Sequence, residues 1–239
     1  MSVYYIDNDP LFPPVEYSNE DGILAVGGDL SPGRLIEAYT NGIFPWDSYE
    51  QQILWWSPDP RFVIHPSEVK VSKSMRQVLR KNVFEIRYDT SFREVITACS
   101  GKRKHQRGTW INTDMIEAYI TLHNLGLAHS VEAWSGDRLA GGLYGVSIGK
   151  MFFGESMFSH ESNASKAAFI VLAENLSRLE FDLIDSQVYT KHMESLGALY
   201  MAREDFIKIV KSSVKKETLC GNWGRFFGSV GAIDPIVRL

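Results

Sequence analysis

Hydrophobic and polar positions between residues 128 and 188 predict a unit of sheet and helix. Three strand-like runs, at 128–134, 138–147 and 150–157, are separated by short turns at 135–137 and 148–150. The segment 164–180 then has apolar residues at helical spacing, and Ser162 or Asn163 precedes it as an N-cap. An apolar run at 181–188 predicts a final, buried strand.

Two polar side chains stand out in that last predicted strand. Asp185 and Gln187 are at positions i and i+2, so a strand over 181–188 would place both on the same face of the sheet. An acid and an amide on an otherwise apolar strand need partners, because burying unpaired polar groups is costly. The pair is therefore a candidate functional site.

The rest of the chain predicts a mixed α/β (α+β) fold with a mostly antiparallel sheet. Residues 1–60 are rich in turns and aromatics and contain one clear helix, at 32–40, with Ser31 as its cap. We interpret them as a small N-terminal domain, followed by a larger domain at 61–239. The later pattern predicts strands at 61–65 and 83–88, helices at 72–81, 91–99, 112–125 and 202–212, and an irregular tail.

Composition excludes several classes of protein. The 239 residues are 44% hydrophobic, which supports a packed core, but no apolar run approaches the roughly 20 residues that span a bilayer. The start of the sequence does not have the pattern of a secretory signal. The two cysteines, 99 and 220, form no C-x-x-C pattern, and the histidines lack the spacing of zinc ligands, so we expect free thiols and no metal.

Basic residues are clustered although the formal net charge is −4, which argues against indiscriminate coating of nucleic acid. Lys73, Arg76 and Arg80 fall on one face of the predicted helix at 72–81, and Lys70 precedes it. A second cluster lies at 102–107. Each cluster fits a solvated surface, and the two together also fit a local phosphate-binding surface.

The helix after the three strands invites comparison with acyl-CoA-dependent acyltransferases. Those enzymes need a glycine-rich turn there, whose backbone N–H groups hold a pyrophosphate. The turn at 159–164 has no glycine, and Glu161 would repel a pyrophosphate. The chain also lacks a P-loop and a G-x-S-x-G motif, so no cofactor is expected.

Several aromatic and apolar residues could belong either to the hydrophobic core or to a binding site. Trp46, Trp55, Trp56 and Trp110 lie in loop-like contexts, where they could pack in the core or stack on a nucleobase. Five further residues face the interior of the strands and the helix, as core or as a pocket for a branched or aromatic side chain. These are Leu143, Phe152, Met157, Phe169 and Leu172.

From about residue 12 to residue 206 the sequence resembles the leucyl/phenylalanyl-tRNA–protein transferase family. The resemblance is carried by long motifs in order: GGDLSP (27–32), NGIFPW (41–46), ILWWSPDPR (53–61), GTWI (108–111), AYITLHNLGLAHSVE (118–132), GGLYGV (141–146), FGESMFS (153–159), NASKAA (163–168) and LIDSQV (183–188). It implies a cytoplasmic, monomeric enzyme with an acetyltransferase-like (GNAT-like) catalytic domain over 61–239. It further implies transfer of Leu, Phe or Met from aminoacyl-tRNA to the α-amine of proteins with N-terminal Arg or Lys, which creates an N-end-rule degradation signal.

The resemblance also implies roles for individual residues. Asp185 and Gln187 match the catalytic pair, and Trp46 and Trp110 match the positions that hold the 3′-terminal adenosine. Tyr119 and Glu155 match polar residues of the active site, and Glu155 would bind either the acceptor's first residue or the donor's α-amine. The five apolar residues match the amino-acid pocket, in which Leu143 and Phe169 replace a methionine and a leucine of a relative. The basic helix and Lys70 would bind tRNA.

The expected chemistry needs neither ATP nor metal, because aminolysis of an activated ester runs downhill. Gln187 would accept a hydrogen bond from the attacking amine, while Asp185 would orient Gln187 or stabilise the developing ammonium. Two other functions remain open at this point. One is an acyl-CoA-dependent N-acyltransferase, and the other is a non-catalytic module that binds tRNA 3′ ends.

Overall fold

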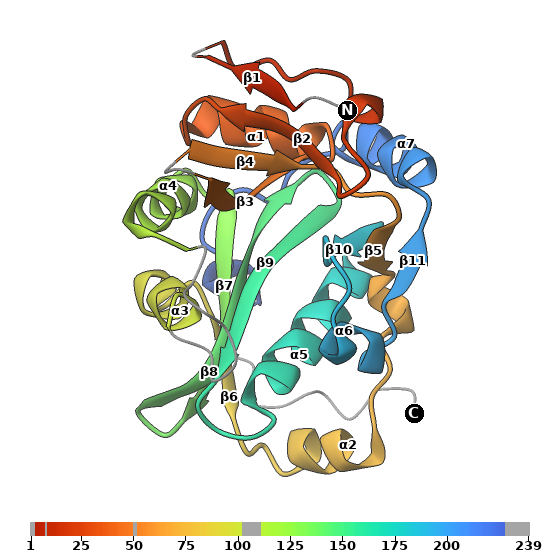
Figure 1. Ribbon diagram of the computed structural model, residues 1–239. Coiled ribbons are helices and arrows are strands. Elements are labelled where there is room, and N and C mark those ends of the chain that lie inside the picture. Colours follow the sequence, from red (N-terminus) through yellow and green to blue (C-terminus); the bar gives the residue numbers. More distant parts are fainter. Residues whose placement is uncertain (1–2, 8, 50–51, 102–110, 228–239) are drawn as a thin grey trace.

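The protein has two β-sheets with helices around them (Figure 1). The structure is a computed structural model, and it describes residues 3–7, 9–49, 52–101 and 111–227. The smaller sheet lies within residues 4–56, and the larger sheet takes its strands from residues 61–201. The fold is mixed α/β, as the sequence predicts.

The smaller sheet has four strands in the order β1–β2–β4–β3. In this order, β1 spans Tyr4–Ile6, β2 spans Ile23–Gly27, β4 spans Gln52–Trp56 and β3 spans Phe44–Tyr49. The sequence predicts the intervening helix α1 (Pro32–Thr40), whose N-cap Ser31 accepts a hydrogen bond from the backbone N–H of Arg34. The four strands are not predicted, because they are short and rich in aromatics and show no regular alternation.

The larger sheet has seven strands in the order β11–β5–β10–β9–β8–β7–β6. Neighbouring strands are antiparallel except β9 and β10, which are parallel, so the sheet is mostly antiparallel as expected. The strands are β11 (Leu199–Met201), β5 (Arg61–Ile64), β10 (Leu183–Asp185), β9 (Met151–Ser159), β8 (Arg138–Ile148), β7 (Ala128–Ser135) and β6 (Glu85–Tyr88).

Helices cover both faces of the larger sheet (Figure 1). The helix α5 (Ala164–Arg178) packs on one face, and α3 (Phe92–Cys99) and α4 (Thr113–Asn124) pack on the other. The basic helix α2 (Lys73–Arg80) lies at the end of the molecule opposite the smaller sheet. The remaining helices are η1 (Val15–Tyr17), η2 (Pro66–Glu68), α6 (Lys191–Ser195), α7 (Arg203–Ser213) and α8 (Gly224–Phe227).

Two hydrophobic clusters stabilise this arrangement. The first joins the smaller sheet and α1 to the α3–α4 face of the larger sheet, so Trp55 and Phe44 belong to the same cluster as Phe153 and Tyr119. The second lies between α5 and the other face. Because the first cluster takes side chains from both sheets, residues 4–56 bury their core against the rest of the chain.

The predicted cap of α5 is wrong in its details. Asn163 is the N-cap residue, but its backbone is left-handed, with φ 71°, and its side chain makes no capping hydrogen bond. The hydroxyl of Ser159, at the end of β9, accepts from the N–H of Ser165 instead. The strand before the helix therefore supplies the cap.

The prediction of a strand over 181–188 is also wrong at its end. β10 stops at Asp185, and Gln187 follows with a left-handed backbone, φ 64°. The reason is local: the Asp185 carboxylate accepts the N–H of Gln187 at 2.8 Å, which turns the chain out of the sheet. Asp185 and Gln187 are therefore not neighbours on one sheet face.

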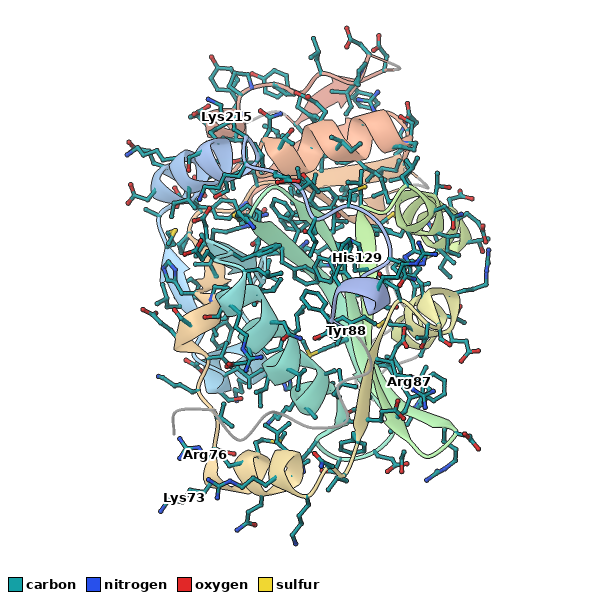
Figure 2. All side chains as sticks on the ribbon, turned by 180° about the vertical axis from the view of Figure 1, so that it is seen from behind. Lys73, Arg76, Arg87, Tyr88, His129 and Lys215 are labelled. Carbon is teal, nitrogen blue, oxygen red and sulfur yellow. The ribbon has the colours of Figure 1, made fainter. Side chains whose placement is uncertain are left out.

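The segment from the end of α7 to residue 227, which the sequence predicts to be irregular, packs against the core and includes the short helix α8. Trp223 is fully buried in the α5-side cluster, and its backbone N–H donates to the Asp89 carboxylate at 2.7 Å. Figure 2 shows His129 and Tyr88 beside this segment on the far side of the sheet. The segment after α7 thus contributes to the core.

Candidate active site

A carboxylate from β9 is the centre of the candidate site. Oε1 of Glu155 accepts hydrogen bonds from the Tyr39 hydroxyl at 2.7 Å and from the Gln187 side-chain amide at 2.8 Å. Oε2 accepts from the Tyr119 hydroxyl at 2.8 Å. The four side chains come from α1, α4, β9 and the loop after β10, so the site combines a helix of the N-terminal part with elements around the larger sheet.

A β-bulge directs Glu155 toward these partners. In the β8–β9 ladder, Gly154 pairs with Gly145 and Ser156 pairs with Tyr144, so Glu155 has no partner of its own on β8. An extra residue of this kind reverses the alternation of side chains along a strand. Phe153 consequently packs in the cluster beside Tyr39, whereas Met157 packs on the α5 side.

The site also lies where the larger sheet splits. β9 and β10 pair only as far as Phe153 and Asp185, while β9 continues to Ser159. Beyond that point, the edge of β9 that carries Glu155 and Met157 has no β10 partner. Glu155 and Met157 lie on opposite faces of β9 along this edge.

Burial changes the acid–base behaviour of this group. It raises the pKa of Glu155 to about 7, and the nearby Asp185 carboxylate acts in the same direction. The hydrogen bonds from Tyr39, Tyr119 and Gln187 favour the charged form and offset part of that rise in pKa. Burial also raises the pKa of both tyrosines well above its usual value, so both remain protonated donors at neutral pH.

Asp185 is fully buried and forms an ion pair with Arg61. Arg61, at the start of β5, donates from Nε to Oδ1 at 2.9 Å and from its terminal nitrogen to Oδ2 at 2.7 Å. The guanidinium also lies 4.5 Å from the ring centre of Phe44 and 4.7 Å from that of Phe206. Because Oδ1 of Asp185 also holds the N–H of Gln187, the ion pair fixes the backbone that presents Gln187.

The side-chain amide of Gln187 is oriented as a result. Its NH₂ group donates to Glu155, so its carbonyl oxygen is the end that can accept a hydrogen bond from another molecule. Asp185 therefore acts on the site indirectly: it positions Gln187, and Gln187 contacts Glu155.

The five apolar residues proposed for the amino-acid pocket gather in one place. Leu143, Phe152, Phe169 and Leu172 are buried in the α5-side cluster, and Met157 is partly buried against it. Leu143 and Met157 are direct partners in the β8–β9 ladder. This apolar group adjoins the split between β9 and β10 from the α5 side.

The tryptophans have different environments. Trp55 is fully buried, as a core residue would be. Trp46 is partly buried: its ring centre lies 5.3 Å from that of Trp56, and its carbonyl accepts the Trp56 indole N–H at 2.6 Å. Trp110 and the basic cluster at 102–107 lie outside the described residues.

The basic residues lie apart from the carboxylate site. Lys70, Lys73, Arg76 and Arg80 are all exposed, and α2 is at the end of the molecule away from α1 (Figures 1 and 2). The N-terminal part of the chain, by contrast, is acidic: residues 1–60 contain ten of the 29 acidic side chains but only one of the 25 basic ones. An anionic macromolecule would therefore favour the end that carries α2.

Sequence reasoning missed two members of the site, Tyr39 and Arg61. Tyr39 lies on the buried face of α1 together with Leu35 and Ala38. A tyrosine on an otherwise apolar helix face needs a hydrogen-bond partner for its hydroxyl, and this was the only feature of the sequence that could have indicated its role. Arg61 opens the apolar strand β5, directly after the WWSPDP segment, and a charged residue in a buried strand needs a partner.

The described residues contain no group of three or more His, Cys, Asp or Glu side chains that could hold a metal ion. Within that same part of the chain, no helix is long and apolar enough to cross a membrane.

Comparison with known proteins decides the family. The model described as leucyl/phenylalanyl-tRNA protein transferase matches residues 63–211, and the model of that family's N-terminal domain matches residues 28–59. A leucyl/phenylalanyl-tRNA–protein transferase of Syntrophus aciditrophicus is 58% identical over 214 residues, which cover 89% of this chain and 90% of the relative. The chain belongs to the leucyl/phenylalanyl-tRNA–protein transferase family. It is therefore an aminoacyl-tRNA–protein transferase, an acyltransferase-type enzyme.

A second relative supports the assignment to this transferase family. The similarly named protein of Flavobacterium johnsoniae is 52% identical over 211 residues, 88% of this chain and 100% of the relative. Solved structures are more distant: L-PGS from Bacillus licheniformis aligns over 72% of this chain and 57% of its own, with 8% identity and a TM-score of 0.35. A likeness at that level carries no argument, so the GNAT-like topology of this transferase stays a prediction.

Proposed function

We propose that this transferase moves Leu, Phe or Met from aminoacyl-tRNA to the α-amine of proteins whose first residue is Arg or Lys. The product would be an N-end-rule degradation signal made in the cytoplasm. The observation that carries the proposal is the contact of Gln187 with Glu155 at the split between β9 and β10. It supplies an oriented hydrogen-bond acceptor and a carboxylate that titrates near neutrality.

The two substrates would meet at this split. The donor's side chain enters the apolar group of Leu143, Phe152, Met157, Phe169 and Leu172, and the 3′-terminal adenosine lies against Trp46 and Trp110. The acceptor's α-amine approaches Gln187, whose carbonyl oxygen accepts one N–H and orients the lone pair toward the ester carbonyl. This alignment alone contributes several kcal/mol toward the rate.

The reaction balances with these groups alone. The amine nitrogen forms a bond to the ester carbonyl carbon, and the bond from that carbon to the ribose oxygen breaks. The nitrogen loses one proton, and Glu155, with a pKa of about 7, is the base suited to hold it. The ribose oxygen leaves as a hydroxyl: it takes a proton from the neighbouring 2′-hydroxyl, which regains one from Glu155, so the carboxylate is restored.

Asp185 and Arg61 act through Gln187 in this scheme. Their ion pair is fully buried, so it holds the Gln187 backbone and does not meet the substrate. Tyr39 and Tyr119 keep Glu155 in place and moderate its pKa. We further propose that residues 1–60 form a small N-terminal domain that supplies Tyr39 and Trp46, and that residues 61–239 form the catalytic domain of a monomer.

Basic side chains on and next to α2 would bind the tRNA. Lys70, Lys73, Arg76 and Arg80 are exposed and contact phosphates without reading sequence.

A direct transfer assay tests the proposal. Purified enzyme is incubated with labelled Leu-tRNA and a peptide that begins with Arg, with neither ATP nor CoA, and peptide labelling is expected. A peptide with an acetylated N-terminus is the control and should stay unlabelled. Labelling that requires acetyl-CoA, or tRNA binding without transfer, would support one of the two alternative functions.

A further inference from the structure

The segment after α7 places one large aromatic side chain behind the proposed donor pocket. Trp223 is fully buried in the α5-side cluster, together with Leu143, Phe152, Phe169 and Leu172. Its ring centre lies 5.9 Å from that of Phe152, with the two planes tilted by 37°. The family model ends at residue 211, so this contact comes from outside the matched region.

Trp223 is held in place from three directions. Its backbone N–H donates to Asp89 at 2.7 Å, and its indole N–H donates to the carbonyl of Leu219 at 2.9 Å. One face of the ring stacks on His129, with ring centres 3.9 Å apart and planes 9° from parallel. Asp89 also bonds the imidazole of His129 at 2.9 Å, so one carboxylate fixes both members of the stack.

These contacts make the indole a rigid support for its neighbours. Phe181 and Tyr88 pack around it, with ring centres 6.4 Å and 6.5 Å from that of Trp223. A tryptophan fixed at its backbone N–H, at its indole N–H and on one ring face cannot yield when a neighbouring side chain is pushed against it. Phe152 therefore has no room to move toward Trp223.

We infer that Trp223 is a positioning residue for donor selection: it holds Phe152 forward and thereby limits the depth of the pocket for the transferred side chain. The inference rests on the proposed function, because it assigns Phe152 to that pocket. A smaller residue at 223 would let Phe152 retreat. The longer side chain of Phe would then be accommodated better relative to the shorter one of Leu.

The test is the selectivity ratio, kcat/KM for Phe-tRNA divided by kcat/KM for Leu-tRNA, measured with one Arg-initiated peptide. Trp223→Phe should raise the ratio about tenfold, the lower end of the effect that one methylene group has in an apolar pocket. The change should appear mainly in the KM values for the two donors. A loss of stability alone would lower both kcat/KM values and leave their ratio unchanged.

Trp55→Phe is the matched control. Trp55 is also fully buried, and its indole N–H also donates to a backbone carbonyl, that of Gly27 at 3.0 Å. It belongs to the other cluster, so its replacement should leave the ratio within twofold of wild type.

A double variant tests whether Trp223 acts on selectivity through Phe152. Phe152→Leu enlarges the pocket directly, so adding Trp223→Phe to it should change the ratio by less than twofold. Equal ratios for wild type and Trp223→Phe, or independent effects of the two substitutions, would overturn the inference. Absence of any transfer by the wild-type enzyme would instead overturn the proposed function.

Discussion

The Gln187 side-chain amide donates to the Glu155 carboxylate across 2.8 Å, although Glu155 lies on β9 and Gln187 lies in the loop after β10, beyond the point where these two strands stop pairing. This contact orients the amide with its carbonyl outward. It also ties Gln187 to Tyr39 and Tyr119 through the shared carboxylate.

Asp185→Asn should destabilise the enzyme and lower kcat together. The substitution leaves the Arg61 guanidinium buried without its counter-charge, which typically costs about 3–5 kcal/mol in the free energy of unfolding. Urea denaturation and steady-state kinetics measure the two effects. A variant as stable as wild type but inactive would assign Asp185 a direct electrostatic role in the reaction.

Replacing both partners separates stability from positioning. Arg61→Met/Asp185→Leu removes both charges, so it should recover most of the stability lost in Asp185→Asn. It should not recover kcat, because the N–H of Gln187 then has no acceptor. Recovery of both would mean that the ion pair does not position Gln187.

Transfer should depend on the ionisation of Glu155. If the carboxylate holds the proton, kcat/KM rises with pH through a midpoint near 7, the pKa to which burial raises this group. Tyr39→Phe removes a hydrogen bond that favours the charged form, so it should move the midpoint to higher pH. An unchanged midpoint in Tyr39→Phe would show that another group, such as the acceptor amine, titrates in this range.

Glu155 should also make stability depend on pH. Its pKa is raised on folding from the usual 4.5 to about 7. Between these values the folded state keeps a proton that the unfolded state releases, so wild-type stability falls as pH rises from 5 to 8. Because the side chain is only partly buried, the loss should be about 1–2 kcal/mol. Glu155→Gln should lack this loss, and parallel curves for the two proteins would contradict the assignment.

Charge reversal on α2 should weaken tRNA binding without harming the chemistry. Arg76→Glu/Arg80→Glu is expected to raise KM for Leu-tRNA and to flatten its salt dependence, because two phosphate contacts are lost. Turnover of a minimal aminoacyl-adenosine donor should stay near wild type. The control is Lys208→Glu/Lys215→Glu at the other end of the molecule, where Lys215 is marked in Figure 2. Equal losses with both donors would show that α2 supports folding.

The periodic parts of the chain could be predicted from sequence, and the site could be predicted only in part. The long strands β7, β8 and β9 and the helices α4 and α5 follow regular apolar spacing, and the structure has them within a few residues of prediction. The smaller sheet depends on packing between distant segments, such as Trp55 against Phe12, which no local period reveals.

The polar residues of the site were harder to place for a physical reason. Asp185 and Gln187 were identified, but a strand was expected to hold both, and the backbone turn that separates them depends on one side-chain hydrogen bond. Tyr39 and Arg61 act through contacts with residues more than 100 positions away in the sequence. Sequence spacing carries no signal for pairs of that separation.

The most direct test of the account is the single-turnover rate of Leu transfer from saturating Leu-tRNA to an Arg-initiated peptide, for wild type and Gln187→Ala. Gln187→Ala should lose about 100-fold in this rate while donor affinity stays within twofold, because the hydrogen bond from the attacking amine to the Gln187 carbonyl acts mainly as the new bond forms. Asn124→Ala, which removes an exposed amide at the end of α4, is the control and should react at the wild-type rate. A wild-type rate in Gln187→Ala would contradict the central claim, since the transfer would then not depend on the oriented amide beside Glu155.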